Sequence, residues 1–282
     1  MKLESNGLLI INKEKGYTSR DIVNIISREF ETKKVGHNGT LDPLATGILV
    51  ITINKYTKLN TLLTSEYKEY IAEVTLGIKT DTLDIEGRVL DKKEVHINKN
   101  DLEKTLKKYE KSYMQEVPIY SAVKVNGKKL YEYAREGIHV KLPQKEVTIK
   151  KIELLDFKEN RFTFKCLVSK GTYIRSLIKD ILDDLNIIGT MSNLIRTKQG
   201  IFDISDSYSL DDIKKGNFKL LKIKDVLDIE QIKVDDDLKF KILNGVRLKG
   251  KYPDRVLFLD EDEELAIYKK DGDIMKLEVM LK

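Results

Sequence analysis

The chain has 282 residues, 41% of them hydrophobic, so it can bury a large core, and its length suits one large domain followed by a small one. Near the N-terminus the longest apolar stretch, residues 48–51, is far too short to cross a bilayer, and the first residues lack the apolar core of a signal peptide, so we expect a cytoplasmic protein without membrane contact. The single cysteine, Cys166, excludes an intramolecular disulfide, and the histidines lack metal-ligand spacing, so no metal site is expected.

Charge is unevenly distributed along the chain. The net charge of +5 (51 minus 46) is too small to demand a nucleic-acid partner. Residues 120–200 contain 16 Lys/Arg against 9 Asp/Glu, a local +7, whereas residues 230–282 contain 11 against 13, or −2. A basic central region can neutralise backbone phosphates, but lysine-rich segments are usually only solvated faces. Charge alone leaves both interpretations open.

The first elements are a strand and a helix. Residues 7–12 (GLLIIN) form a short apolar run suited to a buried strand. A Thr-Ser pair followed by an aspartate then opens an amphipathic helix over about residues 19–30. A glycine-punctuated loop, residues 36–47, leads into a β-branched strand over residues 48–53.

The middle of the chain favours a sheet with helices. Residues 68–77 predict a strand, and residues 100–108 a helix capped by Asn98 or Asn100. Asn126 and the glycine after it mark a tight turn.

A hairpin and a helix close the main domain. Residues 145–157 and 161–169 are rich in β-formers and predict a hairpin, and residues 172–186 repeat apolar side chains at helical spacing, so one helix face packs on the sheet. After about residue 202 the chain becomes acidic and irregular. The tail predicts a small β-rich module with a short helix and strands at residues 255–259, 265–268 and 274–280.

The loop at residues 36–47, GHNGTLDPLATG, is the most informative segment. Its glycines permit backbone angles closed to other residues, and Pro43 keeps Asp42 out of the helical region. Asp42 therefore lies in an extended or turn conformation on a loop braced by a strand, where catalytic groups often occur. The alternative is that Asp-Pro is simply a turn dipeptide, which is the commoner case for an isolated pair.

This string resembles the signature of the TruB-type pseudouridine synthases, a family in which the aspartate is catalytic. Further matches occur in the family's order, at residues 13–19, 68–70, 80–87, 118–137, 171–177 and 194–200. Glu14 and Val117 depart from the pattern where prolines are common, and Ile195 does so where a basic residue is usual. The resemblance covers roughly residues 7–202.

The resemblance implies both a fold and a reaction. The fold is α+β, with a catalytic domain over residues 1–230 that has a mixed, mostly antiparallel sheet, and a small β-rich, PUA-like RNA-binding domain over residues 231–282. The reaction breaks the N-glycosidic bond of a flipped-out T-loop uridine in tRNA, rotates the uracil and rejoins it through carbon. Because nothing is oxidised and no atom is gained, no cofactor is expected.

The resemblance also assigns catalytic residues, namely Asp42, Tyr70 and Arg175. The mechanism needs an ionised aspartate, and a cation must offset its desolvation. Arg175 matches the family residue that pairs with the aspartate, and its guanidinium can do so through two parallel hydrogen bonds. Tyr70 matches the residue that stacks on the uracil and assists proton transfer, since an aromatic ring can replace the stacking lost on base extrusion.

Three further residues are assigned to substrate binding. Tyr173 and Leu194 match residues that line the base pocket, and His37 matches a histidine that enters the space vacated in the T-loop. Each has an ordinary alternative. Without the motifs, Tyr173 and Leu194 would be core residues, His37 a plain loop residue, and Arg175 a surface group on the first turn of a helix.

Two other functions remain open from the sequence. One is a pseudouridine synthase of broader or RNA-guided specificity, which the absence of long basic extensions disfavours. The other is an RNA-binding or folding module that has lost catalysis, which would not require the carboxylate of Asp42. The expected partner is the T-arm stem-loop of tRNA, with no obligate protein partner.

Overall fold

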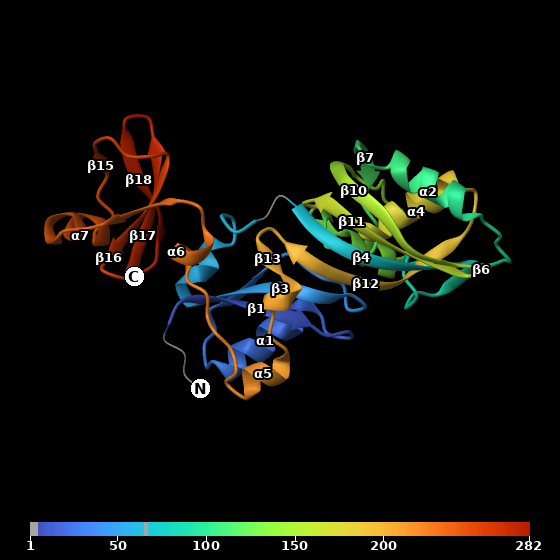
Figure 1. Ribbon diagram of the computed structural model, residues 1–282, viewed down its shortest axis with the longest axis horizontal. Coiled ribbons are helices and arrows are strands. Elements are labelled where there is room, and N and C mark those ends of the chain that lie inside the picture. The colour runs from blue at the N-terminus through green and yellow to red at the C-terminus, as the bar shows by residue number, and fades with distance from the viewer. Residues whose placement is uncertain (1–4, 65–66) are drawn as a thin grey trace. The chain divides into compact units, whose positions relative to one another are not determined.

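The computed structural model describes residues 5–64 and 67–282, which form two compact units (Figure 1). The terminal unit comprises Met1–Pro43, Ile48–Thr64 and Ser205–Lys282. The central unit comprises Leu44–Gly47 and Ser65–Ile204. Within the described residues, no helix is both long and apolar enough to span a membrane.

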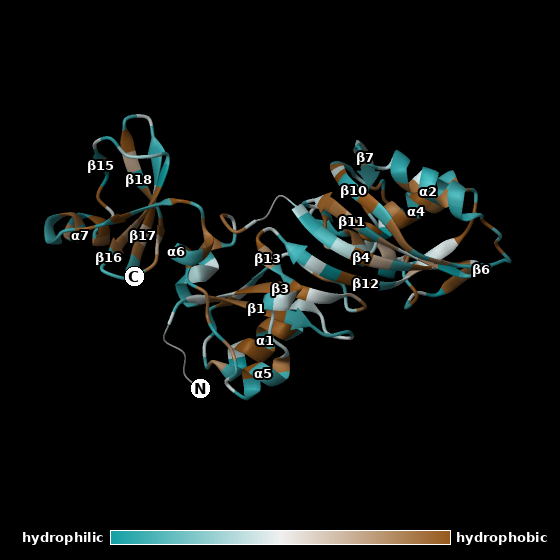
Figure 2. Ribbon diagram, in the orientation of Figure 1, coloured by the Kyte–Doolittle hydropathy of each residue, from teal (hydrophilic) through white to brown (hydrophobic). Residues whose placement is uncertain are grey.

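The N-terminal part of the terminal unit packs a helix against buried strands. β1 (Gly7–Lys13) and β3 (Thr46–Ile53) are neighbours, and Figure 2 shows both mainly brown because most of their residues are hydrophobic. Almost every side chain of the two strands is buried. α1 (Ser19–Glu29) begins with a capping box formed by Thr18 and Asp21, and its apolar face shares one core with the strands. These elements confirm the predicted strands and first helix.

Short helical segments lie outside these elements. They include η1 (Asn54–Leu59), η2 (Ile204–Asp206), α5 (Leu210–Lys214) and α6 (Ile223–Val226).

β2 (Val35–Asn38) corrects one prediction, because the glycine pattern assigned its last three residues to a loop. The structure pairs β2 antiparallel with β3, with His37 opposite Ile51. This pairing gives the backbone groups of β2 their hydrogen-bond partners, which the local sequence could not reveal. The irregular part of the loop therefore starts at Gly39.

The C-terminal part of the terminal unit is a five-stranded sheet in the order β14-β16-β17-β18-β15. It has its own apolar core, in which Phe258 contacts Tyr268 edge to face, with ring centroids 5.4 Å apart. The predicted helix and three strands are confirmed as α7, β16, β17 and β18, and two strands were not predicted. The elements are β14 (Glu230–Lys233), α7 (Asp236–Leu243), β15 (Leu248–Lys249), β16 (Arg255–Asp260), β17 (Glu263–Asp271) and β18 (Ile274–Met280).

The central unit is built on strands in the order β12-β4-β11-β10-β7, which lie side by side in Figure 1. All of these pairs are antiparallel, whereas Thr46 and Gly47 at the start of β3 pair parallel with β12. The mixed, mostly antiparallel sheet is thus confirmed, as is the hairpin of β10 and β11. The strands are β4 (Tyr67–Leu76), β7 (Ser112–Glu116), β10 (Gln144–Lys158), β11 (Arg161–Ser169) and β12 (Gly189–Gln199).

Two helices of the central unit contact the sheet and each other. α2 (Lys99–Lys108) is capped by Asn98, which decides between the two predicted caps. α4 (Ile174–Asp184) starts later than predicted, because Tyr173 is its N-cap residue. The buried face of α4 packs on β12 and β7, as its apolar spacing predicts. The smaller elements are β5 (Ile78–Thr80), β6 (Val89–Lys92), β8 (Lys124–Val125), β9 (Lys128–Lys129), α3 (Leu130–Glu136) and β13 (Phe202–Asp203).

Candidate active site

The predicted site residues are divided between the two units. The terminal unit holds His37 and Asp42. The central unit holds the rest, which are Tyr70, Tyr173, Arg175 and Leu194. The pairing of Asp42 with Arg175 stays a prediction.

Asp42 lies half-buried on the irregular loop before β3, and the residues on either side of it are anchored. The backbone N–H of Leu41 donates to Ser19 Oγ (2.9 Å), and the same hydroxyl donates to the Leu41 carbonyl (3.3 Å). The carbonyl of Pro43 accepts from the N–H of Gly16 (2.9 Å). These contacts hold the backbone on both sides of Asp42 in place.

Lys13 adds a cation to this support. Its side chain is fully buried, and its ammonium donates to the carbonyls of Tyr17 (2.7 Å), Glu14 (3.0 Å) and Pro43 (3.4 Å). A buried ammonium requires such acceptors. Lys13, which in the sequence is only one residue of a family motif, thus joins the end of β1 to the residue after Asp42.

Gly47 ends the signature loop at a place where no other residue fits. Its φ is +98°, and a Cβ at this position would lie 2.2 Å from the carbonyl oxygen of Arg196 and 2.8 Å from its nitrogen. Both close neighbours are backbone atoms of β12, to which Gly47 is paired. The glycine therefore brings the loop against β12, the strand that also presents Leu194.

Replacing Gly47 with Ala should destabilise the protein by about 3 kcal/mol or more, because φ is unfavourable and β12 must also move. Gly16→Ala is the matched control, since Gly16 has φ +89° but nothing lies within 4 Å of its would-be Cβ. That variant should lose only about 1–2 kcal/mol, the cost of the backbone angle. Urea unfolding measures both, and equal losses would show that the contact with β12 is unimportant.

Arg175 extends from the first turn of α4 and is 5% exposed. Its guanidinium donates to the carbonyls of Thr82 (3.0 Å) and Tyr120 (3.1 Å), and Nη1 lies 4.0 Å from Oδ2 of Asp84. Asp84 is itself buried and accepts from Thr82 Oγ1 (2.8 Å). These contacts place Arg175 inside the central unit, so it is not a surface group on the helix.

Tyr70 and Leu194 lie on the same face of adjacent strands. Leu194 is paired with Ala72, two residues after Tyr70, and paired residues point to the same side of a sheet. Both side chains are buried, Tyr70 at 7% and Leu194 at 6% exposure. The two residues are therefore diagonal neighbours, as a shared pocket would require.

Tyr173 is held at the N-terminus of α4 by Gln115. The backbone N–H of Tyr173 donates to Gln115 Oε1 (2.8 Å), and Gln115 Nε2 donates to the Tyr173 carbonyl (3.2 Å) and to the Tyr113 hydroxyl (2.9 Å). Gln115 is 1% exposed. It thus fixes the peptide groups on both sides of the Tyr173 Cα.

The roles of Asp84 and Gln115 are not apparent from the sequence. Asp84 belongs to a matched motif, residues 80–87, but nothing in that string indicates that its partner is Arg175. Gln115 lies just before the motif that begins at Pro118, in a segment without an assigned pattern. Its burial follows from packing in the folded protein, so no local pattern in the sequence could have singled it out.

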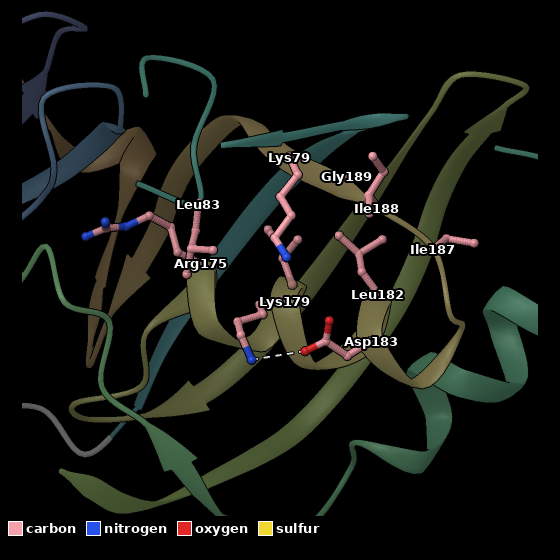
Figure 3. Close-up of a pocket in the computed structure, with 10 residues that line it drawn as sticks. Lys79, Leu83, Arg175, Lys179, Leu182, Asp183, Ile187, Ile188 and Gly189 are labelled. Atoms are coloured by element: carbon pink, nitrogen blue, oxygen red, sulfur yellow. Dashed lines mark hydrogen bonds and ion pairs between the residues drawn. The ribbon is translucent and has the colours of Figure 1, made fainter. Parts of the chain in front are cut away.

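A cavity of about 60 Å³ borders the stem of Arg175. Figure 3 shows the Arg175 guanidinium directed away from Lys79 and Leu182, so the cavity borders the aliphatic part of the side chain. At its rim Lys179 pairs with Asp183 (3.0 Å). The cavity therefore lies beside Arg175, and the guanidinium does not point into it.

Across the described residues, no group of three or more His, Cys, Asp or Glu is placed to hold a metal ion.

Comparison with known proteins adds sequence relatives and fold relatives. Residues 27–174 match the model of the TruB family pseudouridylate synthases (N-terminal domain). Proteins named tRNA pseudouridine synthase B match this chain along most of their length. The protein of Caldicellulosiruptor saccharolyticus is 39% identical over 96% of both chains. The protein of Staphylococcus aureus is 41% identical over 93% of this chain and 94% of its own. Among solved structures, a chain of a Cbf5-Nop10-Gar1 complex matches with a TM-score of 0.71 at 22% identity, covering 98% of this chain and 85% of that one, which indicates a shared fold.

Proposed function

Because the chain belongs to the TruB family of pseudouridylate synthases, we propose that it converts the T-loop uridine of tRNA to pseudouridine. One observation carries this proposal: the identity of 39–41% to relatives named tRNA pseudouridine synthase B, over more than nine tenths of each chain. The enzyme is an isomerase. The bond from N1 of the uracil to the sugar breaks, a bond from C5 forms, and C5 loses a proton while N1 gains one.

The residues of the site divide this work. Asp42 is the catalytic carboxylate, and it must be ionised whether it attacks the sugar, attacks the ring or removes a proton. Arg175 supplies the compensating cation. Tyr70 stacks on the extruded uracil, which Tyr173 and Leu194 enclose, and the buried diagonal placement of Tyr70 and Leu194 supports this assignment. His37 fills the space that the base leaves in the T-loop.

RNA recognition and cellular location extend the proposal. Residues 231–282 serve as a PUA-like RNA-binding domain after a catalytic domain over residues 1–230, and the separate core of the C-terminal sheet supports this division. The T-arm of tRNA is the binding partner, no protein partner is required, and the enzyme acts in the cytoplasm.

An unmodified T-arm transcript tests the proposal directly. Purified protein without added cofactor should form pseudouridine at one T-loop uridine. Because uridine and pseudouridine have the same mass, the product is detected by carbodiimide derivatisation, which stops reverse transcription at the modified position. A transcript with cytidine at that position is the control. Binding should weaken with salt, since the logarithm of the association constant falls by roughly 0.7 to 0.9 per neutralised phosphate for each decade of salt.

The other functions predict different outcomes. Binding without any pseudouridine would identify an RNA-binding module without catalysis. Modification of ribosomal RNA but not of tRNA would identify a synthase of broader or guided specificity. Either result would overturn the proposal.

A further inference from the structure

Cations from separate strands gather on the face of the central sheet that presents Tyr70. Side chains alternate along a strand, so Lys68 lies on the same face of β4 as Tyr70, two residues away. Arg196 on β12 is paired directly with Tyr70. On β10, Lys145 shares a face with Val147 and Ile149, and Ile149 is paired with Val168, the partner of Lys68. Register therefore places all three cations on one face.

The Lys145 ammonium also reaches the segment before Tyr173. A Cβ on Gly171 would lie 1.9 Å from Lys145 Nζ, so the ammonium lies against the bare backbone of that glycine. Gly171 is two residues before Tyr173. Lys68 thus lies on the strand that carries Tyr70, and Lys145 lies against the turn that carries Tyr173, the two aromatic residues of the proposed base pocket.

The charge of Lys68 is disfavoured by its surroundings. Burial, and then the charges of Arg196 and Lys145, lower the pKa of Lys68 to about 8. Within the part of the chain that the structure describes, neither Lys68 nor Lys145 forms an ion pair. On the opposite face of the same sheet, by contrast, Lys165 pairs with Glu69 (3.1 Å). Two neighbouring lysines without a carboxylate partner favour a bound anion.

We propose that Lys68 and Lys145 form a binding site for one backbone phosphate of the substrate RNA, the phosphate next to the uridine whose base lies at Tyr70. Two residues of an extended strand span roughly 7 Å, a separation comparable to that between a base and its own backbone phosphate. The site rests on the proposed function, because the position of the uracil comes from it. Two ammonium groups match the charged phosphate oxygens, and the missing side chain of Gly171 leaves room for the Lys145 ammonium.

Two substitutions and a matched control test the site. Lys68→Met and Lys145→Met should each weaken binding of the T-arm stem-loop roughly tenfold, the loss of one hydrogen bond to a charged group. The salt dependence should become shallower by roughly 0.7 to 0.9 for the lost phosphate contact. Lys165→Met removes a lysine from the other face of the sheet and should bind like the parent. Lys145 is exposed, so its variant serves the test even if Lys68→Met folds poorly.

A chemical change in the RNA identifies the phosphate. A neutral methylphosphonate placed on the 5′ or 3′ side of the target uridine should weaken parent binding at one of the two positions. At that position Lys145→Met should lose no further affinity, because the same contact is already absent. The phosphate site would be overturned if the affinity losses caused by Lys145→Met and by the methylphosphonate multiplied at both positions. It would also be overturned if both lysine variants bound the RNA like the parent. Either result could occur while the parent still modifies the RNA. Failure of the parent to modify any tRNA would instead refute the proposed function, and this site with it.

Discussion

Replacing Asp42 with Asn should abolish pseudouridine formation, lowering the single-turnover rate at least about 10³-fold, because the amide has the same shape but cannot carry the negative charge. The loop should keep its conformation, since its anchors are the backbone groups of Leu41 and Pro43 held by Ser19, Gly16 and Lys13. We therefore expect the dissociation constant for the T-arm to change little. Single-turnover assays and filter binding on the same RNA measure the two quantities.

Asp91→Asn is a suitable control for this experiment, because Asp91 is an exposed carboxylate on β6. It should match the parent in rate and affinity. Appreciable turnover by Asp42→Asn would mean that another group performs the chemistry. A parallel loss of rate and affinity would mean that Asp42 mainly shapes the RNA-binding surface.

Arg175→Met should lower the rate roughly 10²- to 10³-fold, because it removes the cation proposed to keep Asp42 ionised against the nucleotide. It should also destabilise the protein by about 3–5 kcal/mol, since it leaves buried Asp84 without its charged partner. The carbonyls of Thr82 and Tyr120 lose their donors at the same time. Rate measurements at saturating RNA and urea unfolding give the two effects separately.

Two further variants separate charge from geometry at this position. Arg175→Lys keeps the charge but not the fork of donors that reaches both carbonyls, so it should recover stability more fully than rate. Asp84→Asn keeps the shape of the loop and removes only the charge beside Arg175, and it should lower the rate about tenfold. If Arg175→Met matched the parent in rate, the predicted pairing with Asp42 would be wrong.

The sequence was sufficient where short-range signals specify structure. Thr18 and Asp21 are three residues apart, and their capping box starts α1 where the pattern predicts. The β10–β11 hairpin and the buried β3 follow from runs of β-formers beside turn residues. Family membership likewise followed from contiguous strings, of which the one containing Asp42 is the most specific. The assignments of individual site residues remain predictions.

Only the tertiary structure decided which distant groups meet. Arg175 donates to a carbonyl 93 residues away, and Gln115 holds a tyrosine 58 residues away, so no local pattern could link these partners. β2 and β12 were missed as strands because their hydrogen bonds are made with neighbours remote in the sequence. The same reason applies to Lys68 and Lys145, because each is an ordinary lysine in its own strand and only the sheet places both on one face. Local sequence can specify backbone conformation over a few residues, whereas long-range pairing depends on the free energy of the whole packed sheet.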